Sequence, residues 1–426
     1  MKALIISHNP MSTKHSIGKT LLSLFSDFKK EEMCQLYIHT GVPEFDVCSS
    51  FYRITDKDVL YGVFKRKVAG GQVAASADGR PQTNSTDSFY KQTYGNPKNR
   101  APHRELLRDM MWKMSPWYNK DLKNWIGAEK PTCIFVAIGS GKFLYDMALK
   151  ISKDYNIPIY TYVCDDFYSM KTPRGICGGI WKKSLVKKTR KLMERSRAVI
   201  SICEEMSDLY GAEFGRPAVT VMTGTNYSVA EIPKVNEGAK TIRYFGKVSL
   251  NRYKSIADIC RAIDKLNEKL GENFSLEIYC DDIGDEVKTE FRDIKSARFC
   301  GYISGEEFKD RFFSSDILLH IEAFDAESVD RVRHSVSTKI ADSMASGIPM
   351  FAYGPDSVAS IRHLLRNNAG VVATSKDELE EKIKSVFLSR EVRLEAARNG
   401  IETAKKYHDS QKASAKIFEL LNDSEL

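Results

Sequence analysis

Short apolar runs alternate with longer segments in which apolar residues recur with the period of a helix over most of the chain. Apolar runs rich in β-branched and aromatic residues are typical of buried strands, and the segments between them are typical of amphipathic helices. Alternation of this kind predicts an α/β fold, with parallel sheets covered by helices on both faces. The first series of expected strands is 3–7, 34–38, 133–138, 157–163, 198–202 and 218–222.

A second series of expected strands follows and predicts a second domain of the same kind. Its members are 241–245, 275–280, 297–300, 317–321, 350–353 and 370–373. The polar stretch 229–240, which contains Pro and Gly and has no period, is expected to join the domains. We therefore expect two Rossmann-like doubly wound domains facing a cleft, at 1–232 and 240–408, and a last helix at 409–426 that crosses back to the first domain. Ligands of such sheets bind at the carboxyl ends of the strands.

Composition and net charge limit the classes of binding partner that we expect, but they do not select one class. The 426 residues are 42% hydrophobic, which excludes global disorder, and 64 Lys and Arg against 56 Asp and Glu leave a net charge of +8. Positive charge suits nucleic acid, an anionic membrane surface or phosphorylated substrates. The nine cysteines form no CxxC pair and the eight histidines show no metal spacing, so we expect neither disulfides nor a metal. The first residues lack a signal-peptide core, which favours a cytoplasmic protein.

Three glycines of the first domain lie in turns that follow expected strands. Gly18 stands in SIGKT, but a P-loop would need Gly where Thr13 stands, so the turn either lets backbone amides approach an anion or is a simple turn. Gly139 and Gly141 form a GxG turn, and a dinucleotide fingerprint would need a third Gly where Leu144 stands. We expect both turns at the edge of the cleft. The segment 68–102 is irregular and too long for an ordinary connection.

Two adjacent carboxylates, Asp165 and Asp166, follow the expected strand 157–163. At a strand's carboxyl end such a pair can orient a sugar hydroxyl of an acceptor or act as acid or base, and Asp165 is our candidate for catalysis. The alternative is a helix cap beside a solvated charge. The sequence leaves both interpretations open.

Tryptophans and cations gather between residues 104 and 191. Trp112, Trp117 and Trp125 accompany an apolar stripe of helical spacing, and a fourth tryptophan opens the basic run 181–191. Such stretches can lie on an anionic bilayer, with rings at the headgroups and cations toward the lipid. The alternative is one helix that faces the core and one that is solvated. Nucleic acid is not expected, because no known binding module accompanies the cations.

The second domain contains the clearer candidates for ligand-binding residues. Gly246 ends an expected strand, and Lys247, Arg252 and Lys254 follow on the loop before a helix, a pattern that suits a diphosphate. Ser337, Thr338 and Lys339 begin another helix, where free amides and a nearby cation bind phosphate. Asp342, one turn further in, is placed to accept hydrogen bonds from ribose hydroxyls.

Several motifs resemble those of GT-B glycosyltransferases, and in particular glycosyltransferase family 4, of the type that builds bacterial capsular and other surface polysaccharides. The resemblance rests on GKVSLNRYKS (246–255), FCGYIS (299–304), SDILLHIEAF (315–324) and above all STKIADSMASGIPMFAYGP (337–355). A looser match, SRAVISICEEMSDLYGAEFG (196–215), extends it into the first domain. The resemblance implies a metal-independent, retaining transfer from a nucleotide sugar to a glycan or lipid-linked glycan, without a cofactor. The first domain then holds the acceptor.

The resemblance also assigns roles in the second domain. The family pairs two glutamates eight residues apart, where this chain has His334 and Asp342, so Glu322 is expected to take the sugar-binding part beside His334. Lys247 stands where the family often has Arg, and Tyr302 is expected at the base. Arg252 and Lys339 are the expected catalytic cations, because without a metal they must stabilise the leaving diphosphate. Rival interpretations are a sugar-nucleotide epimerase or a phosphorylase on this fold and an inactive, membrane-docked assembly partner.

Overall fold

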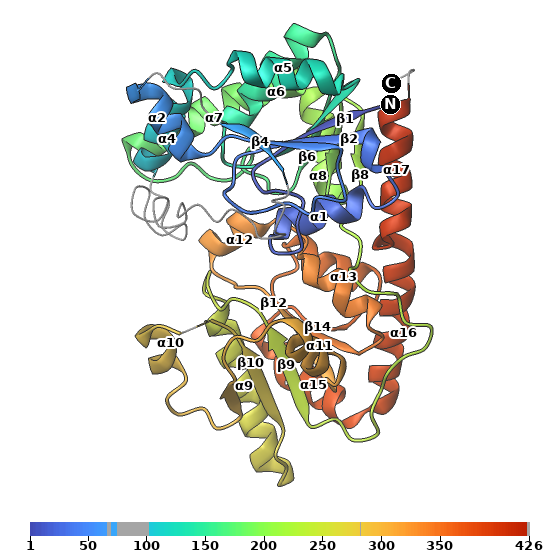
Figure 1. Cartoon of the computed structure of the whole chain (residues 1–426). Helices are drawn as coiled ribbons and strands as arrows, with labels where there is room; N and C mark the ends of the chain where they lie inside the picture. Colours follow the sequence, from blue (N-terminus) through green and yellow to red (C-terminus); the bar gives the residue numbers. More distant parts are fainter. Residues whose placement is uncertain (66–69, 75–101, 282, 424–426) are drawn as a thin grey trace. The chain divides into compact units, whose positions relative to one another are not determined.

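The computed structural model describes residues 1–65, 70–74, 102–281 and 283–423. It consists of two compact units, Met1–Met222 with Gln411–Leu426, and Thr223–Ser410 (Figure 1). Each unit contains one sheet of mainly parallel strands with helices on both faces, which confirms the predicted pair of Rossmann-like domains. The boundary at Thr223 lies earlier than the predicted join. The reason is that residues 230–237 hydrogen-bond within the second unit, for example Ala230 N to Ala345 O.

The first unit has an eight-stranded sheet in the order β4-β3-β2-β1-β5-β6-β7-β8, parallel except for β4. The expected strands all form, and the short strands β3 and β4 were not predicted, because β3 has few apolar residues and β4 lies in the irregular segment. The strands are β1 (Ala3–Ser7), β2 (Met33–Tyr37), β3 (Ser50–Arg53), β4 (Gly71–Val73), β5 (Cys133–Ile138), β6 (Ile159–Val163), β7 (Ser196–Ser201) and β8 (Ala218–Thr220). The rest of the irregular segment, apart from residues 70–74 and 102, lies outside the described residues.

The helices of the first unit include the last helix of the chain. They are α1 (Ser16–Leu24), α2 (Asp56–Lys65), α4 (Pro102–Met114), α5 (Lys120–Glu129), α6 (Phe143–Tyr155), α7 (Ile176–Arg195), α8 (Glu204–Phe214) and α17 (Ser410–Asn422), with a 3₁₀ turn at Lys30–Glu32. Ser414 of α17 accepts from the Asp27 amide, and the Phe418 ring packs edge-on against Phe28. The last helix therefore packs on the first unit.

The second unit has a six-stranded parallel sheet in the order β11-β10-β9-β12-β13-β14. Its strands are β9 (Thr241–Phe245), β10 (Ser275–Tyr279), β11 (Ala297–Phe299), β12 (Ile317–Ile321), β13 (Met350–Tyr353) and β14 (Val371–Ala373). Its helices are α9 (Arg252–Leu270), α10 (Asp285–Glu290), α11 (Gly305–Phe313), α12 (Ala326–Val332), α13 (Thr338–Ala345), α14 (Ala359–Arg366), α15 (Lys376–Leu388) and α16 (Arg390–Tyr407).

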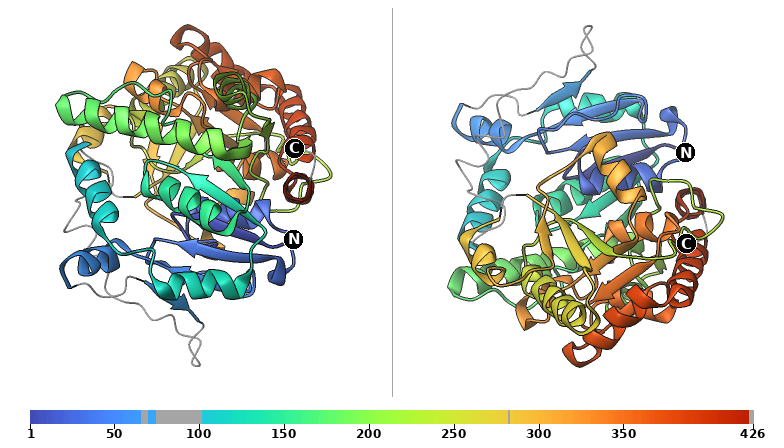
Figure 2. Two further views of the ribbon diagram at one scale, coloured as in Figure 1. Left: turned by 90° about the horizontal axis from the view of Figure 1, so that it is seen from above. Right: turned by 90° about the horizontal axis from the view of Figure 1, so that it is seen from below.

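Alternating side chains of each strand in this sheet enter two different cores. On β12, Ile317, Leu319 and Ile321 pack with α9 and α15, whereas Leu318 packs with α13 and α14 on the other face. This two-residue period follows from the pleat of a strand, and it directs His320 toward the α13 and α14 face. Within the described residues, no helix is long and apolar enough to cross a membrane. Figure 2 shows both units from two further directions.

Candidate functional site

A pocket of the second unit lies where the strand order of its sheet reverses. β9 pairs with β10 on one side and with β12 on the other, so the connections leave the sheet in opposite directions at this point. Because β9 and β12 are parallel, the residues that follow them, Gly246 and Glu322, meet at the same edge. Such a switch point is where open α/β sheets bind ligands. Eleven residues line the pocket, among them Arg252, Glu322 and Lys339.

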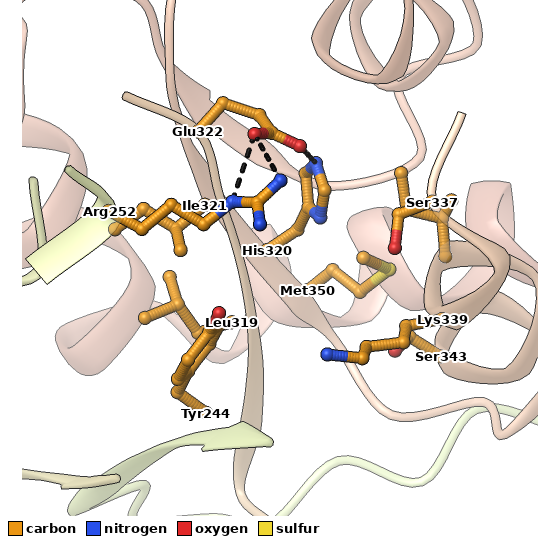
Figure 3. A pocket seen from close by; sticks show the side chains of 11 residues that line it. Tyr244, Arg252, Leu319, His320, Ile321, Glu322, Ser337, Lys339, Ser343 and Met350 are labelled. Atoms are coloured by element: carbon orange, nitrogen blue, oxygen red, sulfur yellow. Dashed lines mark hydrogen bonds and ion pairs between the residues drawn. The ribbon is translucent and has the colours of Figure 1, made fainter. Parts of the chain in front are cut away.

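Arg252 and Glu322 form a buried ion pair in this pocket (Figure 3). Both Nε and one terminal nitrogen of Arg252 donate to Glu322 Oε2, at 3.0 and 2.7 Å. Burial raises the pKa of the Glu322 carboxyl, and the neighbouring guanidinium opposes that change. Burial alone would lower the pKa of Arg252, but Glu322 holds it above its usual value. The pair thus keeps a cation at the strand edge in a weakly solvated site.

His320 lies beside this pair and stays neutral. Its Nε2 is 3.0 Å from Ser360 Oγ and 3.7 Å from Glu322 Oε1. Burial first, and then the charges of Arg252 and Lys339, lower its pKa to about 3. A neutral imidazole therefore lines the pocket at physiological pH. The sequence analysis missed this residue, because a single histidine between apolar strand residues gives no signal distinct from a core position.

Lys339 approaches the pocket from the first turn of α13. Its ammonium points into the pocket in Figure 3, and a Cβ added to Gly246 would overlap it, so Gly246 leaves the space that the ammonium fills. Desolvation, followed by the charge of Arg252, lowers the pKa of Lys339 to about 8 although part of its side chain is exposed. In the part of the chain that the structure describes, no side chain caps α13 and its first turn has no acidic residue. Amides and cations here favour an anion.

The loop between Gly246 and Arg252 is conformationally unusual. Leu250 and Asn251 both have a positive φ, of 58° and 55°, and leucine rarely adopts that conformation. Asn251 donates from its side chain to Asp325, which itself caps α12 by accepting from the Ser328 amide. The strained turn delivers Arg252 to the first position of α9. Backbone strain that surrounding contacts maintain is concentrated at functional sites.

Other residues expected at the donor site lie around this pocket without lining it. Lys247, Lys254 and Tyr302 are exposed, and Tyr302 keeps 71% of its surface open. Thr338 is the first residue of α13, directly between the lining residues Ser337 and Lys339. His334 is half-buried and is not among the residues that line the pocket.

Asp342 is engaged within the second unit. Its Oδ1 accepts from the Asn226 amide at 2.8 Å and from Thr225 Oγ1 at 3.1 Å, and the Asn226 side chain donates to both oxygens at 3.2 Å. A ribose hydroxyl at this carboxylate would have to share it with that turn. The structure thus brings Arg252, Glu322 and Lys339 together and gives Asp342 a role in local packing.

The expected glycines of the first unit have local packing roles. Gly18 lies inside α1, where a Cβ would come within 2.5 Å of the carbonyl oxygens of Pro10 and Ser12. The residue therefore lets the preceding loop lie against the helix. Gly139 and Gly141 follow β5, the Gly139 carbonyl accepts from the Tyr145 hydroxyl, and a Cβ on Gly141 would press on the Phe143 ring.

The two carboxylates after β6 differ. Asp166 accepts from the Ser169 amide at 3.0 Å, from the Ser169 hydroxyl and from the Tyr210 hydroxyl at 3.0 Å, so it holds a turn together. Asp165 is exposed, and its carbonyl oxygen accepts from the Phe167 amide. Asp166 therefore stabilises a local turn, and Asp165 is the more exposed residue of the two.

The tryptophans do not lie where a bilayer would reach them. Trp112, Trp125 and Trp181 are 1%, 6% and 5% exposed, and Trp117 is half-buried. The Trp112 ring donates to Asp56 Oδ1 at 2.7 Å and stacks on Phe143, and Trp125 donates to Ser50 Oγ. Burial therefore argues against an interfacial role for Trp112, Trp125 and Trp181. On α4 itself, Trp112 is buried, whereas Leu107, Met110 and Met114 of the apolar stripe are exposed.

Within the described ranges, no group of three or more His, Cys, Asp or Glu side chains could hold a metal ion. This statement concerns side chains alone. A metal held by a bound diphosphate would not need such a group.

Known proteins are similar to part of this sequence and to the fold of the whole chain. Residues 254–419 match the family model Glyco_trans_1_2, described as Glycosyl transferase-like. No curated protein matches the chain. Among solved structures, HepE from Anabaena in complex with UDP is similar over 99% of both chains, with 10% identity and a TM-score of 0.64.

Two sugar-phosphate enzymes have the same fold. Sucrose-phosphate synthase from Thermosynechococcus elongatus covers 99% of this chain and 98% of its own, with 10% identity and a TM-score of 0.61. An α,α-trehalose 6-phosphate synthase from Burkholderia multivorans has the same coverage, with 9% identity and a TM-score of 0.59. These likenesses establish the GT-B fold for the chain.

Proposed function

We propose that the protein transfers a sugar from a uridine diphosphate sugar to a hydroxyl of a glycan acceptor in the synthesis of a surface polysaccharide. The observation that carries the proposal is the convergence of Arg252 and Lys339 on one pocket at the switch point of the second sheet. The region that matches the glycosyltransferase-like family model, 254–419, contains Lys339 and adjoins Arg252. Uridine is chosen because HepE, which shares the fold, was solved with UDP and with UDP-glucose.

In this proposal the diphosphate lies between Arg252, Lys339 and the amides of Ser337 and Thr338, with Gly246 allowing a close approach. Lys247 and Lys254 add charge from exposed positions nearby. As the bond to the sugar breaks, negative charge grows on the departing phosphate, and cations that already face it need not reorganise. Partial desolvation of Lys339, seen in its lowered pKa of about 8, strengthens that interaction.

The remaining donor contacts follow from the residues around the pocket. Glu322 orients Arg252 and presents a carboxylate to the sugar, with His334 nearby in sequence on the same connection. Tyr302 is exposed after β11 and is assigned to the base. Asp342 is assigned to the ribose, whose hydroxyls would compete with Thr225 and Asn226 for hydrogen bonds to its carboxylate.

The proposed reaction is retaining and needs no metal. The bond between the anomeric carbon and the β-phosphate oxygen breaks, a bond from the acceptor oxygen to that carbon forms on the same face, and the acceptor proton passes to the departing phosphate. UDP and the glycoside are the products. In this proposal the protein acts in the cytoplasm, and its first unit binds the acceptor. The exposed carboxylate of Asp165 in that unit would orient the acceptor hydroxyl.

A thermal shift with UDP in the presence of EDTA tests the donor site. Binding to the folded state adds about 2.7 kcal/mol at a hundredfold excess over Kd, which raises the melting temperature. Cytidine and guanosine diphosphates serve as matched ligands. An unchanged melting temperature with all three nucleotides, with and without Mg²⁺, would contradict the donor site, and a response only with Mg²⁺ would contradict metal independence.

Release of UDP from a panel of UDP sugars then tests the chemistry. One or more donors should be hydrolysed slowly, because water replaces the acceptor. A specific observation favours a second candidate, a binding-competent but inactive assembly partner: His334 stands where the family has a carboxylate and does not line the pocket. UDP binding without turnover of any donor, with or without glycan acceptors, would select that candidate.

A further inference from the structure

The carboxylate of Glu322 uses its two oxygens unequally (Figure 3). Arg252 donates from Nε and from a terminal nitrogen to the same oxygen, Oε2, at 3.0 and 2.7 Å. The other oxygen, Oε1, lies 3.7 Å from Nε2 of His320, which is beyond hydrogen-bond distance. Arginine binds an anion most strongly when two N–H groups meet two oxygens side by side. The observed contact lacks that arrangement, and Arg252 leaves Oε1 for another donor.

The base of the Glu322 side chain is fixed at the end of β12. Its amide donates to the Tyr353 carbonyl at 3.0 Å, and its own carbonyl accepts from the Ser255 hydroxyl at 3.0 Å. A Cβ added to Gly354 would come within 2.9 Å of Glu322 Cβ, so the two residues are packed tightly. A change of hydrogen-bond partner at Glu322 is therefore a turn of the carboxylate about its own side-chain bonds.

His320 is held where it can serve as that partner. Its Nε2 lies 3.0 Å from Ser360 Oγ of α14, and the two residues are 7% and 0% exposed. The nearby carboxylate favours the proton on Nε2, because an unprotonated Nε2 would direct a lone pair at Oε1. His320 is neutral, as its lowered pKa of about 3 shows. It therefore holds one N–H group between two acceptors, Ser360 Oγ and Glu322 Oε1.

A diphosphate in the proposed donor site would compete with Glu322 for Arg252. Its phosphates carry more negative charge than a carboxylate and offer pairs of oxygens to the guanidinium. Glu322 is only 4% exposed, and a buried carboxylate that loses its ion-pair partner is strongly destabilising. Lys339, the other cation that acts on this carboxyl, faces the same diphosphate. Glu322 therefore needs a further donor when the diphosphate binds.

We propose that His320 is a positioning residue that takes over Glu322 when Arg252 turns to the diphosphate of the donor. The inference rests on the proposed function. In the exchange, Oε1 moves from 3.7 Å to within hydrogen-bond distance of Nε2 and accepts from its N–H, which it then shares with Ser360. No proton is transferred, so Glu322 stays ionised and His320 stays neutral. Oε2 is released to accept from a hydroxyl of the sugar.

Calorimetric titration of the full chain with UDP tests this proposal in variants of His320. His320→Phe keeps a flat ring but has no donor for Glu322, so UDP affinity should fall by about 10- to 100-fold. His320→Gln retains an N–H donor and should keep most of the affinity. His363→Phe is the matched control and should bind UDP like the wild type. His363 is buried to the same degree in the same unit, at 8%, and is not among the residues that line the pocket.

The same substitution in a Glu322→Gln background separates positioning from packing. A neutral amide leaves no buried charge behind when Arg252 turns away. His320→Phe should therefore cost little further UDP affinity in that background. A packing defect caused by the substitution would cost the same affinity in both backgrounds.

A spectroscopic measurement on the wild type does not depend on how well His320→Phe folds. In protein with isotope-labelled histidine, the Nε2–H signal of His320 is identified by its absence in His320→Gln. This signal should move downfield when UDP binds, because a hydrogen bond to a carboxylate is shorter and stronger than one to a hydroxyl. A purely structural role for His320 predicts no such change.

Each outcome decides the proposal. A downfield shift, with a loss of affinity that His320→Phe shows in the wild-type background alone, supports it. An unmoved signal in protein that binds UDP overturns it, as does an equal loss in both backgrounds, in His320→Gln or in His363→Phe. Absence of UDP binding by the wild type contradicts the proposed donor site, and the inference falls with it. The two failures are distinguishable, because the inference alone fails only in protein that binds UDP.

Discussion

The carboxyl edges of the two sheets use charge in opposite ways. At the second sheet, Glu322 is buried beside Arg252, and Lys339 lies near both with its pKa lowered to about 8. At the first sheet, Asp166 is fully occupied by Ser169 and Tyr210. Both edges carry the residue types that sequence analysis selects for chemistry. Charges that perturb one another in a pocket mark a binding site, whereas a carboxylate saturated by its own turn marks structure.

The largest contrast should come from Lys339. Lys339→Ala removes a cation that faces the leaving diphosphate and should lower turnover by on the order of 10²-fold. Lys254→Ala, which removes a cation outside the pocket, is the control and should have a much smaller effect. Steady-state rates of UDP release compare the two. Equal losses in both variants would mean that general positive charge, and not the pocket, is what matters.

The same residue predicts a pH dependence. Because the pKa of Lys339 in the free protein is about 8, kcat/KM should fall as the pH rises through that value and the ammonium loses its proton. Lys339→Arg should retain part of the activity and move this fall to higher pH. A pH profile that is the same in both proteins would assign the titration to another group.

Acid should weaken the second unit before the first. Burial lowers the pKa of His320 and His363 to about 3 and of His408 to about 4, against 6.5 when unfolded. Their contribution is therefore present above pH 6.5 and is lost as the pH falls toward 4, by about 2 kcal/mol per histidine at pH 5. All four tryptophans lie in the first unit, so their fluorescence reports that unit alone.

Circular dichroism should accordingly lose signal at a higher pH than tryptophan fluorescence does. His363→Gln is the matched variant, because it removes one group of the pair in which His363 Nε2 lies 3.0 Å from His408 Nε2. It should make acid unfolding of the second unit less steep. Coincident transitions by both probes would show that the units unfold together or that these histidines titrate normally.

A pair of glycines should separate binding from folding. In Gly246→Ala the added methyl overlaps the flexible end of Lys339 and lies 3.0 Å from the Tyr244 hydroxyl oxygen, so UDP affinity should fall by about tenfold with a smaller loss of stability than in Gly18→Ala. In Gly18→Ala the methyl meets two backbone carbonyl oxygens, so stability should fall by about 1–3 kcal/mol with UDP affinity unchanged. Calorimetric titration measures the UDP affinity and melting curves measure the stability of both variants. A loss of stability in Gly246→Ala and a loss of UDP affinity in Gly18→Ala would contradict the roles given to these glycines.

The adjacent aspartates provide the smallest contrast. Asp166→Ala breaks hydrogen bonds from Ser169 and Tyr210 and should cost about 1–2 kcal/mol of stability. Asp165→Ala, at an exposed position, should cost less stability than Asp166→Ala and lower the rate of transfer to the acceptor. Destabilisation by Asp165→Ala alone would contradict the division of roles between them.

Strand and helix patterns were recoverable from the sequence because their periods reflect which side of each element is buried. Every predicted strand forms within a residue or two, and the failures occur at β3 and β4, where short, partly polar strands leave little periodic signal. For the donor site, the structure brings Arg252 and Lys339, both selected from the sequence, into one pocket. Their roles in donor binding and catalysis stay predictions.

What the sequence determined by itself is local: where the elements begin and end, the parallel class of both sheets, and which loops carry cations. Only the tertiary structure decided which residues meet. It turned Trp112 inward and Met110 outward on the same helix, occupied Asp342 with Thr225 and Asn226, and set the neutral His320 beside Glu322. The physical reason is that burial and pairing depend on partners far away in the chain, whereas periodicity depends only on near neighbours.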